Sequence, residues 1–217
     1  SFNSYLVVFR QLVRPITNTF IYGCTAVMII VLLSILLAYL FTRKKNWFGS
    51  ILDSITMFPY IIPGSVLGIT MLLAFNSKPF LFSGSAMIII TAFVIRRLPY
   101  TLRSSTAILY QISPSIEEAS INLGCHPVFS FFRITVVMML PGVLAGALLS
   151  WITVFTELSA SVILYTGKTK TMSVAIYAEV IRASYGTAAA LSSLLTLIIL
   201  ISLLVFFRLS GKRQISM

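Results

Sequence analysis

The chain has 217 residues, of which 58% are hydrophobic and only 10% are charged, whereas about 25% of the residues in a soluble domain are charged. This contrast excludes a soluble globular enzyme, a disordered tail and a nucleic-acid-binding module. The 16 lysines and arginines outnumber the 5 acidic residues and give a net charge of +11. In so apolar a chain, basic residues bear first on how the protein is oriented in a membrane.

Five stretches lack Asp, Glu, Lys and Arg and are candidates for membrane-spanning helices, which need about 20 apolar residues. These stretches are 19–41, 54–77, 79–95, 134–156 and 183–207. Because they are continuously apolar rather than alternating, we expect an all-α polytopic bundle of about five spans. Residues 1–217 are expected to form a single transmembrane domain with short helices on its cytoplasmic side.

Five spans would place the two termini on opposite sides of the membrane. If the C-terminus is cytoplasmic, most basic residues fall on the inner side, as expected for inner-membrane proteins. These inner residues are Arg43, Lys44, Lys45, Arg96, Arg97, Arg103, Arg133, Arg208, Lys212 and Arg213. We therefore expect a multi-pass protein of a bacterial cytoplasmic membrane. For an outside start we expect either a missing upstream helix or one half of a longer or fused protein.

The second expected span contains two prolines, Pro59 and Pro63, which remove backbone donors from one helical face. Such breaks are tolerated where protein or a cavity covers the freed carbonyls. Simple helix packing and a place on a pathway wall are both open for them. Glycines four residues apart allow helices to approach closely. Two such pairs are Gly64 with Gly68 and Gly142 with Gly146.

The inner segment of about 97–133 contains a compact helix at 113–124 with start and stop signals. Pro114 suits the first helical position. Ser115 with Glu118 fits a capping box, and Ser113 is the alternative cap. Gly124 suits a left-handed helix end. Two roles are open for this helix: lying on the bilayer surface, or docking into a groove of a soluble partner.

Glu118-Ala119-Ser120, followed by Gly124 and then Ile134, resembles the Glu-Ala-Ala…Gly…Ile signature of binding-protein-dependent ABC importer permeases. Segments 97–103, 141–147 and 157–160 also resemble that family. Ser120 replaces the usual Ala. Val136-Val137 stands where the family usually has a Leu-Pro pair, so we expect the fourth span to start near Pro141.

The resemblance implies that Glu117, Glu118, Ala119, Ser120 and Gly124 dock into a cytoplasmic ABC ATPase dimer. That ATPase would bind ATP and Mg²⁺ and would perform the hydrolysis, so no cofactor and no enzymatic activity are expected of this chain. The further implied partners are a second permease unit or half, an extracytoplasmic substrate-binding protein and the lipid bilayer.

Segments 157–165 and 172–177 resemble ferric-iron-type permeases most, which implies ferric iron as the substrate. Phosphonate, sugar-phosphate, thiamine and sulfate permeases share parts of these segments. Two alternatives from other classes are a secondary transporter that works without an ATPase and a membrane-embedded enzyme. Against the enzyme, the sequence has no clustered His, Asp or Cys.

Glu157 is expected in the outer half of the membrane, where a charged group is costly and commonly faces a cavity or a partner. Its carboxylate would suit a hard cation. We therefore place Glu157 and Ser159 on a translocation pathway, together with Pro59 and Pro63. The alternatives for Glu157 are the outer end of a helix or an ion pair with Arg182.

Two helix boundaries are also expected at prolines. Pro99 is expected to break the helix that leaves the membrane after the third span. The fourth span is expected to run from near Pro141 past Glu157 to Tyr165. His126 is the only histidine and has no neighbouring ligands, so no metal site is expected.

Overall fold

The computed structural model of the chain describes residues 2–43, 47–78 and 81–214. Within these ranges the chain forms helices and turns and no β-strand, so the predicted all-α fold is confirmed. The predictions that concern Lys44, Lys45 and Pro79 lie outside the described residues.

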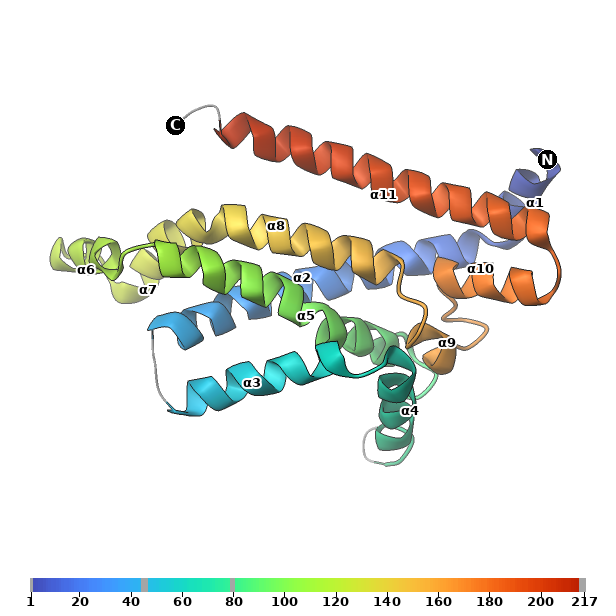
Figure 1. Cartoon of the computed structure of the whole chain (residues 1–217), viewed down its shortest axis with the longest axis horizontal. Coiled ribbons are helices and arrows are strands. Elements are labelled where there is room, and N and C mark those ends of the chain that lie inside the picture. The colour runs from blue at the N-terminus through green and yellow to red at the C-terminus, as the bar shows by residue number, and fades with distance from the viewer. Residues whose placement is uncertain (1, 44–46, 79–80, 215–217) are drawn as a thin grey trace. The chain divides into compact units, whose positions relative to one another are not determined.

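The helices follow one another along the chain with short connections (Figure 1). Their bounds are α1 Phe2–Gln11, α2 Val13–Arg43, α3 Trp47–Ile61, α4 Gly64–Ala74, α5 Ala86–Gln111, α6 Pro114–Asn122, α7 Pro127–Ser130, the π-helix η1 Phe131–Thr135, α8 Val136–Phe155, α9 Ser161–Leu164, α10 Met172–Ile181 and α11 Tyr185–Gln214.

Three helical stretches in the described part of the chain are long and apolar enough to cross a membrane: Val13–Arg43, Pro127–Phe155 and Tyr185–Arg208. The pair Gly49–Ile61 and Gly64–Ala74 adds a fourth if the two helices form one broken span. The break at residues 62–63 agrees with the helix-breaking role predicted for Pro63, whereas the break predicted at Pro59 is wrong, because Pro59 lies inside α3. The third expected span lies largely in α5, whose later turns carry Arg96, Arg97 and Arg103.

The two boundaries predicted at prolines are wrong, because Pro99 lies inside α5 and Pro141 inside α8. Near Pro99, the hydroxyl of Ser150 donates to the carbonyl of Arg97 at 3.1 Å. A neighbouring helix thus supplies a hydrogen bond in the turn that the proline weakens, as is common in membrane helices.

The end predicted for the fourth span is also wrong, because α8 ends at Phe155. The carboxylate of Glu157 accepts hydrogen bonds from the Ser159 hydroxyl at 2.7 Å and from the Ala160 backbone N–H at 3.2 Å. Such local side-chain hydrogen bonds compete with helical ones. They close a turn, and the short helix α9 begins only after it.

The chain divides into two compact units, and α2, α5 and α8 contribute to both. Unit 1 comprises Ser1–Val27, Ile62–Arg96 and Trp151–Met217. Unit 2 comprises Met28–Ile61 and Arg97–Ser150. In unit 1, α1 and α10 pack against α11, and α4 packs against α9 (Figure 1).

Unit 2 is built around a small apolar core from three helices. α2 contributes Ala38, α5 contributes Leu102 and Leu109, and α8 contributes Met139 and Val143, all of them almost fully buried. Figure 1 shows α6 and α7 at the end of this unit where α5 stops and η1 begins. This core therefore packs α5 against α8, the two long helices that precede and follow α6 in the chain.

Candidate functional site

The start of α6 follows from two local signals in the sequence. Pro114 occupies the first turn, and the Ser113 hydroxyl accepts a hydrogen bond from the Ser115 backbone N–H at 3.4 Å. Ser113 is therefore the cap, and the alternative with Ser115 as the cap is wrong. The two serine hydroxyls also lie 2.7 Å apart.

The end of α6 is a Schellman motif built on Gly124, as predicted. Gly124 has a φ of +89°, a conformation that costs a residue with a Cβ about 1–2 kcal/mol. Its N–H donates to the carbonyl of Ile121 at 2.9 Å, and the N–H of Cys125 donates to the carbonyl of Ser120 at 3.1 Å. These bonds match the two that define the motif.

Substitutions at two left-handed positions are expected to shift stability in opposite directions. Gly124→Ala should lower the free energy of unfolding by about 1 kcal/mol, because only the backbone conformation opposes the new Cβ, which meets no atom within 4 Å. Ala183 ends α10 with a φ of +58°, so Ala183→Gly should raise stability by a similar amount. Unfolding in detergent measures both, and equal signs would contradict the prediction.

The helix α6 is exposed along its length. None of its residues is buried. Glu118 and Ala119 are exposed and Ser120 is half-buried. Apolar side chains that face outward are Ile116, Ile121 and, just beyond the helix, Leu123, which is 90% exposed. Exposed apolar residues gathered on one helix commonly mark a protein or membrane contact.

Glu117 differs from Glu118, because its carboxylate faces the rest of unit 2. It accepts hydrogen bonds from the Tyr39 hydroxyl on α2 at 2.5 Å and from the Thr135 hydroxyl on η1 at 3.2 Å. The Tyr39 ring also contacts Phe131 edge-on, with centroids 4.7 Å apart. Glu117 therefore anchors α6 to two neighbouring helices.

A second polar site lies in unit 1 around Glu157. Glu157 is only 3% exposed, and its Oε2 lies 3.4 Å from Nε of Arg96 in α5. Its Oε1 accepts from Ser159 and Ala160. The carboxylate thus joins α5 to the turn after α8. Its partner is Arg96, whereas Arg182 pairs with Glu179 at 3.4 Å, so the predicted alternative partner is wrong.

Gly64, the first residue of α4, completes this site. A Cβ placed on Gly64 would lie 1.7 Å from Nη1 of Arg96 and 2.0 Å from the Ser159 hydroxyl. The absence of a side chain therefore lets α4 approach the ion pair directly. Gly68, one turn on, packs in the same way against Ile163. The close approach predicted for this glycine pair is confirmed.

The predicted pathway residues are only partly brought together. Glu157 and Ser159 are hydrogen-bonded to each other, and Pro63 directly precedes Gly64 as the N-cap of α4. Pro59 lies inside α3, in unit 2. Whether any of these four residues lines a pathway stays a prediction.

Three residues of these sites were not predicted from the sequence. Arg96 was assigned to the inner surface, although an arginine next to an apolar run is itself a signal of a buried partner. Tyr39 and Thr135, which hold Glu117, carry no local signal because their roles depend on contacts between distant segments.

The described residues contain no group of three or more His, Cys, Asp or Glu that could hold a metal ion. The Glu157 carboxylate, considered above as a cation ligand, already accepts two hydrogen bonds and pairs with Arg96. A cation would have to displace Arg96 to reach it.

The long apolar helices define a multi-pass membrane protein. Residues 30–214 match the family described as "Binding-protein-dependent transport system inner membrane component". The chain belongs to this family.

Among the relatives is the ferric transport system permease protein FbpB of Actinobacillus pleuropneumoniae, which is 31% identical over 98% of this chain and 32% of its own length. The chain thus spans about a third of that relative. A putative 2-aminoethylphosphonate transport system permease protein of Salmonella paratyphi A is 26% identical over 78% of this chain and 63% of its own length.

The fold is that of solved transporter chains. A chain of a bacterial ABC transporter involved in the import of the acidic polysaccharide alginate superposes with a TM-score of 0.78, covering 98% of this chain and 84% of its own. The two sequences are 16% identical, so this likeness establishes the fold alone.

Proposed function

We propose that the chain is a permease unit of an ATP-driven importer and that its substrate is ferric iron delivered by a binding protein. Family membership supports the importer class. The ferric transport relative matches nearly the whole chain at 31% identity, whereas the phosphonate relative matches less of it at 26%. Iron is therefore favoured over phosphonate.

The observation that carries the proposal is the exposed yet anchored helix α6. Its outer side offers Glu118, Ala119 and Leu123 to a partner. Its inner side is bound through Glu117 to α2 and η1. A docking helix fixed in this way would transmit the closure of a cytoplasmic ATPase dimer to the spans. A secondary transporter without an ATPase has no need of such a helix.

The remaining partners follow from the same proposal. The ATPase would bind ATP and Mg²⁺, and this chain would bind neither. A second permease unit or half would complete the pathway, and a binding protein would dock on the outer side. The C-terminus would be cytoplasmic, with α6 on the same side, in agreement with most of the basic residues counted as inner. Arg96 is the exception, because it pairs with Glu157.

The substitution Glu118→Lys is expected to abolish co-purification of the membrane protein with its ATPase subunit. The reason is that an exposed carboxylate on α6 is replaced by a cation at a contact where a like charge would be repelled. Asn76→Lys, which places a lysine on an exposed turn of unit 1, is the control and should leave co-purification intact. Retained binding by the Glu118→Lys variant would argue against docking through α6.

The substrate is tested separately, with the full transporter in proteoliposomes and its binding protein outside. We expect uptake of ferric iron that stops when ATP is omitted from the lumen. Uptake that persists without the ATPase would contradict the importer. ATP-dependent uptake of 2-aminoethylphosphonate in place of iron would keep the importer class and overturn the substrate.

A further inference from the structure

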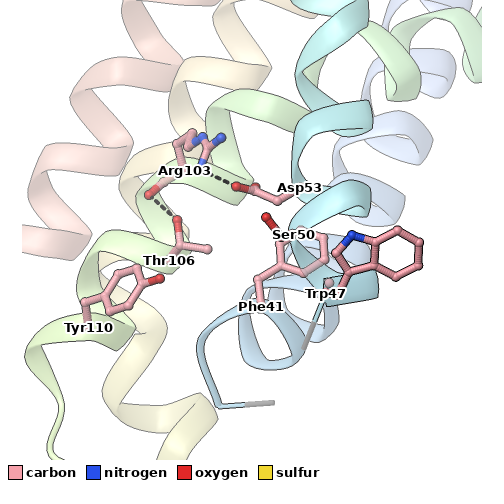
Figure 2. Close-up of a pocket in the computed structure, with 8 residues that line it drawn as sticks. Phe41, Trp47, Ser50, Asp53, Arg103, Thr106 and Tyr110 are labelled. Atoms are coloured by element: carbon pink, nitrogen blue, oxygen red, sulfur yellow. Dashed lines mark hydrogen bonds and ion pairs between the residues drawn. The ribbon is translucent and has the colours of Figure 1, made fainter. Parts of the chain in front are cut away.

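Two cavities lie along the seam between α3 and α5 in unit 2, and they share Arg103. The first has a volume of about 460 Å³ and is drawn in Figure 2. The second, of about 380 Å³, lies beside Met57, Tyr60 and Tyr100. Both volumes are in the range of small-ligand sites. The seam is therefore hollow over several helical turns.

Polar side chains on the two helices meet across this seam. Residues three or four apart share one face of a helix. On α3 these residues are Ser50, Asp53, Met57 and Tyr60. On α5 they are Tyr100, Arg103, Thr106 and Tyr110. Figure 2 shows Asp53 and Ser50 pointing from α3 toward Arg103 and Thr106.

Asp53 and Arg103 form an ion pair in the middle of the seam. Nη1 of Arg103 lies 3.1 Å from Oδ2 of Asp53, and the side chains are 51% and 31% exposed. Nε of Arg103 contacts Sδ of Met57 at 3.3 Å. Because Arg103 is one of the basic residues counted as inner, the pair lies toward the cytoplasmic ends of the two helices, where charged side chains face water or protein rather than lipid. The seam therefore faces an aqueous space or another chain.

We propose that the seam between α3 and α5 lines the aqueous route of the substrate, and that Asp53 is the carboxylate a passing hard cation contacts. This proposal rests on the proposed function for its substrate. The seam offers a carboxylate beside the hydroxyl-bearing side chains of Ser50, Tyr60, Tyr100 and Tyr110. Oxygen donors of this kind suit hard cations.

Arg103 limits how tightly the seam can bind a cation. A route must bind its ion well enough to admit it and weakly enough to release it. By pairing with Asp53, Arg103 neutralises the carboxylate in the empty state and competes with the cation in the occupied state. The pair of Asp53 and Arg103 would therefore bind a cation briefly rather than hold it tightly.

The aqueous character of the seam is tested by cysteine labelling of the assembled transporter in membranes, in a background with Cys24→Ala and Cys125→Ser. Ser50→Cys lines the first cavity, whereas Ile55→Cys is exposed on α3 but lines neither cavity. A water-soluble, charged thiosulfonate should label Ser50→Cys roughly tenfold faster, since lipid excludes the reagent. Equal labelling of the two variants would overturn the proposal.

The role of Asp53 is tested by uptake of ferric iron into proteoliposomes. Asp53→Asn should lower uptake by roughly tenfold or more, because the cation loses its charged contact, while the complex still assembles. The double variant with Asp53→Asn and Arg103→Met removes both charges and leaves no carboxylate at this pair, so restored uptake in it would show a structural pair and overturn the role. If the wild type showed no ATP-dependent iron uptake, the proposed function would fail, and the labelling would still decide whether the seam is aqueous.

Discussion

Replacing Glu157 with Gln is expected to lower the free energy of unfolding by about 3 kcal/mol, because the change leaves a largely buried arginine without its counter-charge. The side chain of Arg96 is 18% exposed and that of Glu157 is 2% exposed. Glutamine keeps an oxygen that can accept the hydrogen bonds from Ser159 and Ala160. The loss of stability therefore reports the effect of removing the negative charge alone. Unfolding of the wild type and the variant in mixed micelles that contain a denaturing detergent measures this difference in the free energy of unfolding.

A double variant and a second ion pair serve as controls for this prediction. Arg96→Met combined with Glu157→Gln should recover most of the lost stability, since removing both partners of a buried pair is often neutral. Glu179→Gln breaks a pair whose arginine is 66% exposed and should cost below about 1 kcal/mol. Equal losses for Glu157→Gln and Glu179→Gln would contradict a buried pair.

The same variants separate a structural role of Glu157 from a pathway role. Iron uptake that recovers with stability in the double variant would mean that the carboxylate only holds α5 to the turn after α8. Uptake that stays low in a stable double variant would mean that its negative charge acts in transport. Unchanged uptake by Glu157→Gln alone would end the pathway role.

Features set by neighbouring residues could be predicted from the sequence. The helix α6 is such a case, since Pro114 and Gly124 act on its own backbone at either end. Its cap could not be decided because Ser113 and Ser115 are chemically alike and even contact each other. Only the backbone direction entering the helix distinguishes them.

Features set by contacts between distant segments could not be predicted. Pro99 and Pro141 were expected to mark helix boundaries, as they would in water. Both lie within helices. Near Pro99, a hydrogen bond from Ser150 on a neighbouring helix supports the weakened turn. The partner of Glu157 is Arg96 rather than Arg182, a choice made by packing between α5 and the turn after α8.

Gly146→Ala is expected to destabilise unit 2 by about 3 kcal/mol, at the upper end of the cost of overpacking. A Cβ on Gly146 would lie 2.6 Å from Cα of Thr101 and 2.9 Å from Cβ of Ser104. Because the first of these atoms belongs to the backbone of α5, no side-chain rotation can relieve the contact. The whole helix would have to move.

Hydrogen bonds above and below Gly146 make such a movement costly. The Ser104 hydroxyl donates to the carbonyl of Gly142 at 2.6 Å, and the hydroxyls of Thr101 and Ser150 lie 2.8 Å apart. Separating the two helices would stretch both contacts, each worth about 1 kcal/mol. The close packing of Gly142 and Gly146 against α5 is thus accompanied by polar contacts between α5 and α8 on both sides of Gly146.

The sign of the effect is the sharpest test of this close packing. In an open helix, alanine is preferred over glycine by about 1 kcal/mol, so a loose contact at Gly146 predicts stabilisation. Gly167→Ala, where a Cβ meets no atom within 4 Å, should change stability by no more than about 0.5 kcal/mol. A Gly146→Ala variant as stable as Gly167→Ala would show that α5 and α8 lie further apart than the structure places them.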